Sequence, residues 1–144
     1  VVVVTDSGGA VCESVWLARA ESVHRQLRPQ LPDDYAGRMS AVFANGARMA
    51  LVVDGGAVRC LALWRLLENT HEGRRLYVDD LVSDEAFRSQ GAGKMMLDWL
   101  EEKAIARGCQ ALTLDSGVQR QGAHRFYFRE GMHIPSFCVK KVLK

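Results

Sequence analysis

The sequence lacks a strong charge of one sign, a paired-cysteine motif and a long uninterrupted apolar run. Its 19 Lys and Arg exceed its 17 Asp and Glu by two, far from the basic bias of most nucleic-acid-binding domains. The longest apolar stretch, 57–67, is broken by Arg59 and Arg65, so we expect no membrane-spanning helix. None of the four cysteines forms a CxxC pair, which excludes zinc-knuckle and thioredoxin-type motifs. We therefore expect no nucleic-acid or membrane partner, and four reduced, mostly buried thiols in a cytoplasmic protein.

What is present suits a single α/β domain over residues 1–144, because this length and a hydrophobic content of 48% are ordinary for one globular domain. Periodicity and turn residues predict strands at 1–5, 48–53, 58–67, 74–83, 110–114 and 137–143, and helices at 12–26, 33–45, 92–107 and 121–130. The order is β-α-α-β-β-β-α-β-α-β. Three consecutive strands predict an antiparallel meander, and the following strand–helix–strand step predicts a parallel pair. We expect a mixed sheet with helices on both faces.

The most informative segment lies between the strand at 74–83 and the helix at 92–107, and reads Arg88-Ser89-Gln90-Gly91-Ala92-Gly93-Lys94. Glycines before a helix let backbone N–H groups approach a ligand, and the helix dipole there favours phosphate. The alternative is a glycine-rich turn that merely begins a helix. A Walker A loop is excluded because Met95 follows the lysine, and a dinucleotide fingerprint is excluded because Met96 replaces its third glycine.

The pattern Arg88-x-x-Gly91-x-Gly93 resembles the signature of the GCN5-related N-acetyltransferases (GNAT). The similarity extends back through residues 80–84 and forward to the run 123–132, which contains Phe126-Tyr127. It covers about residues 76–132, whereas the first half of the chain matches only in the order of its elements. The resemblance implies the GNAT acyl-CoA N-acyltransferase fold and an acetyl-CoA donor, with no metal.

The resemblance also implies which residues hold the cofactor. In the family, loop amides bind the pyrophosphate, and here those positions are Arg88, Ser89, Gln90, Gly91, Ala92, Gly93 and Lys94. The preceding strand end pairs with the pantetheine arm, which carries over to Leu81, Val82 and Ser83. Parallel strands commonly bind ligands at their carboxyl ends, which agrees with this placement.

Acetyl transfer to an amine requires a proton for the departing thiolate. A phenol suits this role, since phenols have a pKa of about 10, close to that of a thiol. Tyr127 matches the family tyrosine near the cofactor sulfur, and we predict that it is the general acid; the alternative is a core aromatic. The predicted function is acetyl transfer from acetyl-CoA to a primary amine of a small molecule or peptide. The alternative is an inactive acyl-CoA-binding sensor or interaction module, against which Tyr127 argues.

The base is assigned to Asp79 or Asp80, or to a water molecule. Strand alternation places these two side chains on opposite faces of the sheet, so we expect at most one of them to face the acceptor directly. Six acids against three bases in residues 65–85 suggest an acidic entrance for a cationic acceptor. The alternative is solvated surface charge, which is the better interpretation for Glu68 and Glu72.

Two helix residues and the oligomeric state stay open at this point. Arg120 stands where many GNAT members carry Asn. Its guanidinium has three alternative partners: an acidic group of the acceptor, a cofactor phosphate, or solvent. His124 is spaced to be a proton partner of Tyr127 or to be a structural histidine. Homodimers are common in the family.

Overall fold

A computed structural model describes residues 1–88 and 90–144, which form two compact units, 1–114 and 115–144. The strands of the first unit are β1 (Val2–Val3), β2 (Arg48–Asp54), β3 (Ala57–Asn69), β4 (Gly73–Ser83) and β5 (Ala111–Leu114). Its helices are α1 (Ser14–Leu27), α2 (Tyr35–Ala44), the short 3₁₀ helix η1 (Glu85–Phe87) and α3 (Ala92–Ala106). The second unit contains α4 (Gln121–Arg129).

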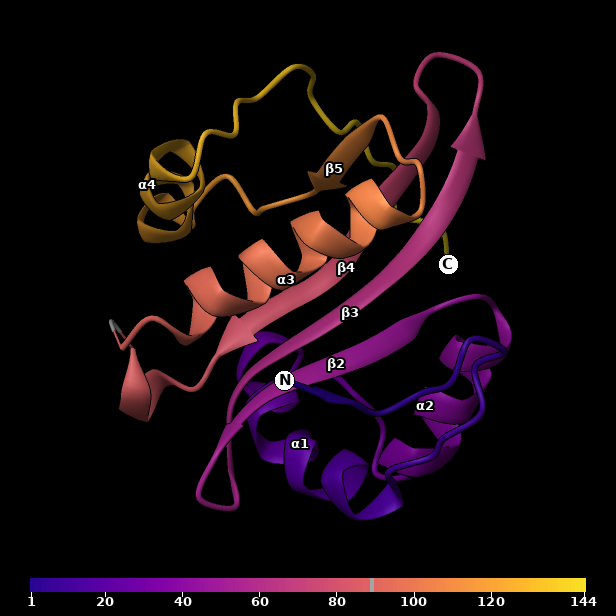
Figure 1. The fold of residues 1–144 in the computed structure, drawn as a ribbon, viewed down its shortest axis with the longest axis vertical. Coiled ribbons are helices and arrows are strands. Elements are labelled where there is room, and N and C mark those ends of the chain that lie inside the picture. The colour runs from indigo at the N-terminus through magenta and orange to yellow at the C-terminus, as the bar shows by residue number, and fades with distance from the viewer. Residues whose placement is uncertain (89) are drawn as a thin grey trace. The chain divides into compact units, whose positions relative to one another are not determined.

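The first unit is built on a five-stranded sheet in which the strands follow chain order, β1-β2-β3-β4-β5 (Figure 1). The pairs β1–β2, β2–β3 and β3–β4 are antiparallel, and β4–β5 is parallel. The crossover between β4 and β5 contains α3, which runs alongside β4 in Figure 1. The predicted meander, parallel pair and mixed sheet are therefore confirmed.

Helices cover both faces of this sheet. Leu61 and Leu63 of β3 belong to a buried cluster with side chains of α1 and α2. Trp64 instead contacts Trp99 of α3, with ring centroids 6.3 Å apart. The buried stripe of α3 consists of Met96, Leu97, Leu100 and Ala104. None of the described helices is long and apolar enough to cross a membrane.

The strand predicted at 137–143 is wrong. Residues 115–144 are all described, and α4 is their only helix or strand. Phe137, Val139, Val142 and Leu143 are at least 80% exposed. A strand is stable only when neighbours take its backbone hydrogen bonds and bury one face, and β-branched composition alone supplies neither.

The cysteines also differ from expectation. All four are free, but only Cys60 is buried, whereas Cys12 and Cys138 are exposed. Cys12 lies in the loop before α1, and Cys138 lies in the segment that forms no strand. The expectation of mostly buried thiols is therefore wrong.

Candidate active site

Strand β4 extends beyond its parallel partner. The β4–β5 pairing ends where Val78 meets Leu114, but β4 continues to Ser83. Residues 80–83 pair with β3 on one side, and no described strand pairs with their other edge. Such an edge offers backbone donors and acceptors to an extended ligand. The strand residues predicted to bind pantetheine lie on it: Leu81, Val82 and Ser83.

The glycine loop opens α3 with a residue that has no side chain to cap the helix. Gly91 is the N-cap residue, has φ +85°, and provides no side-chain cap. A Cβ built on Gly91 meets nothing within 4 Å, so the approach to this helix end is open. The first-turn N–H groups have no intrahelical acceptor, and the helix dipole adds positive potential there. This arrangement fits a phosphate group.

Side chains around the loop add positive charge. Arg88 and Lys94 are exposed on either side of the helix start. The Lys94 ammonium forms an ion pair with Asp98 at 3.1 Å, one turn along α3. Of the remaining predicted loop residues, Gln90, Ala92 and Gly93 lie at this helix start, and Ser89 lies outside the described residues.

A one-residue bulge interrupts β4 at the predicted base. Leu63 of β3 pairs with Asp80, and its neighbour Trp64 pairs with Val78. Asp79 therefore lies opposite no residue of β3 in the strand register. An extra residue of this kind changes the side-chain alternation of the strand.

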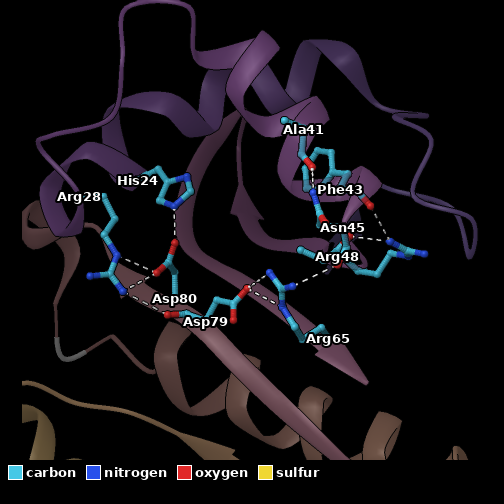
Figure 2. A network of polar contacts seen from close by, with 10 residues as sticks. His24, Arg28, Ala41, Phe43, Asn45, Arg48, Arg65, Asp79 and Asp80 are labelled. Carbon is cyan, nitrogen blue, oxygen red and sulfur yellow. Dashed lines mark hydrogen bonds and ion pairs between the residues drawn. The ribbon is translucent and has the colours of Figure 1, made fainter. Parts of the chain in front are cut away.

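The bulge places both carboxylates on the α1–α2 side of the sheet, so the predicted opposite faces are wrong. Asp79 binds the guanidinium of Arg65, which also donates to the carbonyl of Asn45 at the end of α2. Asp80 accepts a hydrogen bond from His24 of α1. Figure 2 shows both carboxylates within one polar network.

Asp80 is the centre of this network (Figure 2). Its Oδ2 lies 2.7 Å from Nε2 of His24, and its Oδ1 lies 2.8 Å from Nε of Arg28. Arg28 Nη2 also donates to the Asp79 carbonyl at 3.2 Å. Burial favours a higher pKa for the Asp80 carboxyl, but the hydrogen bonds from His24 and Arg28 outweigh it and lower the pKa below its usual value. Asp80 is therefore an anion at neutral pH.

Tyr35 sets the orientation of the histidine. Its hydroxyl lies 2.8 Å from Nδ1 of His24 in the protein interior. Burial, followed by the carboxylates of Glu21 and Asp80, raises the pKa of Tyr35 well above the ordinary value for tyrosine. Tyr35 therefore keeps its proton at neutral pH, and its hydroxyl and the Asp80 carboxylate hold the two ring nitrogens of His24 from opposite sides.

A pocket of about 230 Å³ opens beside Asp80. Its polar lining comes from His24, Arg28, Gln30, Arg38 and Asp80. Asp79 does not line it, so of the two predicted bases only Asp80 borders this space. Sequence reasoning missed the other four residues. One available signal was His24, which lies seven residues after Leu17 on the buried face of α1.

The acidic residues of 65–85 are largely partnered. Ion pairs join Glu68 to Arg74, Glu72 to Arg75, Asp79 to Arg65, and Asp80 to Arg28. The acid excess counted in the sequence is therefore not a free negative surface.

The second unit carries Tyr127. This residue is buried on α4, and its ring centroid lies 5.4 Å from that of Phe126. Arg120 is the N-cap residue of α4, and His124 lies in its first turn.

Comparison with known proteins decides the family. The model of the acetyltransferase (GNAT) family matches residues 13–132. The chain belongs to the GNAT acetyltransferase family. Its GNAT relatives include the uncharacterized N-acetyltransferase YhdJ of Bacillus subtilis, 34% identical over 129 residues, covering 86% of this chain and 89% of YhdJ.

A second sequence relative and a structural neighbour are acetyltransferases named for different substrates. The aminoalkylphosphonate N-acetyltransferase of Salmonella typhimurium is 36% identical over 66 residues, or 46% of this chain and 43% of that protein. Aminoglycoside N-acetyltransferase AAC(6')-Iy, solved with CoA, is similar in fold with a TM-score of 0.79 at 13% identity, covering 92% of this chain and 91% of that chain.

Proposed function

We propose that this GNAT protein transfers an acetyl group from acetyl-CoA directly to the primary amine of a small molecule. The observation that carries the proposal is the start of α3 at Gly91, a glycine N-cap with open space beside it, which follows the β4 edge that no described strand pairs with. The relatives support it, since one is named for aminoalkylphosphonates and a structural neighbour for aminoglycosides.

In this proposal the unpaired edge of β4 holds the pantetheine arm through the backbone of Leu81, Val82 and Ser83. The N–H groups around Gly91 and Gly93 hold the pyrophosphate, with Arg88 and Lys94 beside them. The acetyl thioester then lies toward the bulge at Asp79 and Asp80, because these residues precede the pantetheine segment along β4.

The proposed chemistry separates three tasks. Asp80 attracts the ammonium of the acceptor, and its lowered pKa makes it a poor proton acceptor, so the amine loses its proton to water. Asp79 positions Arg28 through its carbonyl and Arg65 through its carboxylate. Tyr127, in the Phe126-Tyr127 motif of α4, protonates the departing thiolate.

The function is tested by incubating the purified chain with acetyl-CoA and a panel of small amines. Free thiol release that depends on the amine, with an acetylated product found by mass spectrometry, is the expected result. CoA binding without acetylation of any amine contradicts the enzyme assignment and supports an acyl-CoA-binding module instead.

Replacing Gly91 with alanine should weaken CoA binding by about tenfold or more, measured by calorimetry. The added methyl group stands where the pyrophosphate approaches, and φ +85° is strained for alanine. Gly108→Ala is the matched control, because Gly108 has φ +72° and open space at the other end of α3. Both variants should lose a similar amount of stability. Equal CoA affinity in the two variants contradicts the site.

Arg88→Gln should raise the dissociation constant of CoA about tenfold or more while leaving that of phosphate-free pantetheine unchanged. A well-formed charge-assisted contact to phosphate contributes about 1.5–3 kcal/mol. Calorimetry with both ligands measures the difference. Equal losses for CoA and pantetheine would remove the phosphate role from Arg88.

A further inference from the structure

The pocket beside Asp80 has an unusual charge balance for an amine-binding site. Three charged side chains line it: Arg28 and Arg38 are cationic, and Asp80 is anionic. Asp80 already forms an ion pair with Arg28. A simple amine enters such a pocket as a cation, where the surplus positive charge of Arg38 opposes it.

Arg38 is the surplus charge. It lies on the first half of α2, is exposed, and its side chain forms no hydrogen bond or ion pair with the described part of the chain. The acid nearest to it in sequence, Asp34, is engaged elsewhere, because its carboxylate accepts the Gly37 N–H at 3.0 Å. Asp34 does not line the pocket. The Arg38 guanidinium is therefore available to a ligand.

Two more donors face the same space. Arg28 is held by Asp80 through Nε and Nη2, which leaves Nη1 without a partner among the described residues (Figure 2). Gln30, in the loop between α1 and α2, adds an exposed amide to the lining. Guanidinium groups bind carboxylates and phosphonates through paired N–H donors.

We propose that this space, the Arg38 pocket, binds the acyl acceptor, and that the acceptor is a small amine bearing an acidic group, a carboxylate or a phosphonate. Its ammonium lies toward Asp80, the only anionic side chain in the described lining, and its acid binds Arg38 with help from Arg28 Nη1 and Gln30. The inference rests on the proposed function and names the substrate class for it. It replaces the cationic acceptor expected from the acid content of 65–85.

The size of the pocket sets the scale of the acceptor. About 230 Å³ is below the roughly 300–1,000 Å³ typical of sites for drug-sized ligands. Apolar side chains of Met39, Val42 and Leu63 complete the lining. An acceptor with a short alkyl chain between its amine and its acid fits these dimensions and this chemistry.

Four acceptors with the same two-carbon spacing test the proposal: β-alanine, 2-aminoethylphosphonate, ethanolamine and ethylenediamine. With acetyl-CoA and the purified chain, kcat/KM for the two acid-bearing amines should exceed that for the other two by about tenfold or more. Comparing β-alanine with 2-aminoethylphosphonate then decides which acid is preferred.

Variants of Arg38 provide a second test of the proposal. Arg38→Gln should raise the acceptor KM for acid-bearing amines about tenfold or more, with the KM of acetyl-CoA unchanged. Arg38→Glu should reverse the preference toward ethylenediamine. Arg107→Gln is the control, because it removes an exposed arginine outside the pocket and should change neither parameter.

The outcomes separate this inference from the proposed function. Equal use of all four amines, or equal behaviour of Arg38→Gln and Arg107→Gln, overturns the acceptor class while acetyl transfer stands. If CoA binds but no amine is acetylated, the proposed function fails. Calorimetric titration of the two acid-bearing amines into the CoA-loaded protein then tests whether the Arg38 pocket binds them. Binding to the wild type that is lost in Arg38→Gln supports the pocket, and absence of binding to the wild type overturns it.

Discussion

Tyr127→Phe should lower kcat by about 10²–10⁴-fold, the usual contribution of general acid–base catalysis. The substitution removes one hydroxyl and keeps the ring, so CoA affinity should stay nearly unchanged. The high-pH limb of the kcat profile should also shift or disappear, because it reports loss of the donor's proton. Steady-state kinetics across pH, with CoA binding measured separately, tests this result.

Phe126→Leu is the control for packing on α4, since Phe126 and Tyr127 are in ring contact. It should lower the melting temperature and leave kcat within a few-fold of the wild-type value. A folded Tyr127→Phe variant with wild-type turnover, in conditions where chemistry limits the rate, would make Tyr127 a packing residue. The proton would then come from water or His124.

Asp80→Asn should destabilise the protein by about 2 kcal/mol, because the amide replaces a buried, charged acceptor that takes hydrogen bonds from both His24 and Arg28. Asp80 is 8% exposed and holds both His24 and Arg28. Asp79→Asn is the neighbouring control. The Asp79 side chain is 20% exposed, against 9% for the Asp80 side chain, and among the described residues its carboxylate binds Arg65 alone, so we expect a loss of about 1 kcal/mol. Chemical denaturation of both variants measures the difference, and equal losses contradict the central role of Asp80.

The lowered pKa of Asp80 also predicts a pH dependence. Between its folded pKa and the usual value of 3.8, the unfolded chain binds more protons than the folded chain. The stabilisation is therefore complete above this window and is lost as pH falls through it. Denaturation curves should show a steeper loss of stability below about pH 4 for the wild type than for Asp80→Asn. Parallel acid profiles would place the stabilising charge elsewhere.

Local patterns in the sequence were enough to predict where α3 begins and ends. Gly91 and Gly108 mark the two ends of α3, and both adopt the positive φ that glycine accommodates. These features depend on neighbouring residues, so a local pattern is enough to find them. The match to the GNAT signature rests on the same short segment.

The polar network and the pocket around Asp80 depend on contacts that no local pattern contains. His24 and Asp80 are 56 residues apart, and Arg28 and Asp80 are 52 apart. The bulge at Asp79 arises from the register between β3 and β4, and it reversed the predicted placement of a carboxylate. The prediction of a strand at 137–143 is wrong for a related reason. This segment has strand-like composition, but no described strand pairs with it.

The two arginines of the pocket differ in how many contacts they make with the rest of the protein, and this difference bears on how the enzyme would acquire new substrates. Arg28 is tied to Asp80 and to the β4 backbone, so changing it disturbs folding and chemistry together. Arg38 is exposed on α2, and its side chain has no such bonds to the described residues. Natural drift and laboratory selection should therefore alter substrate range at position 38 first, and retain Arg28 while they do so.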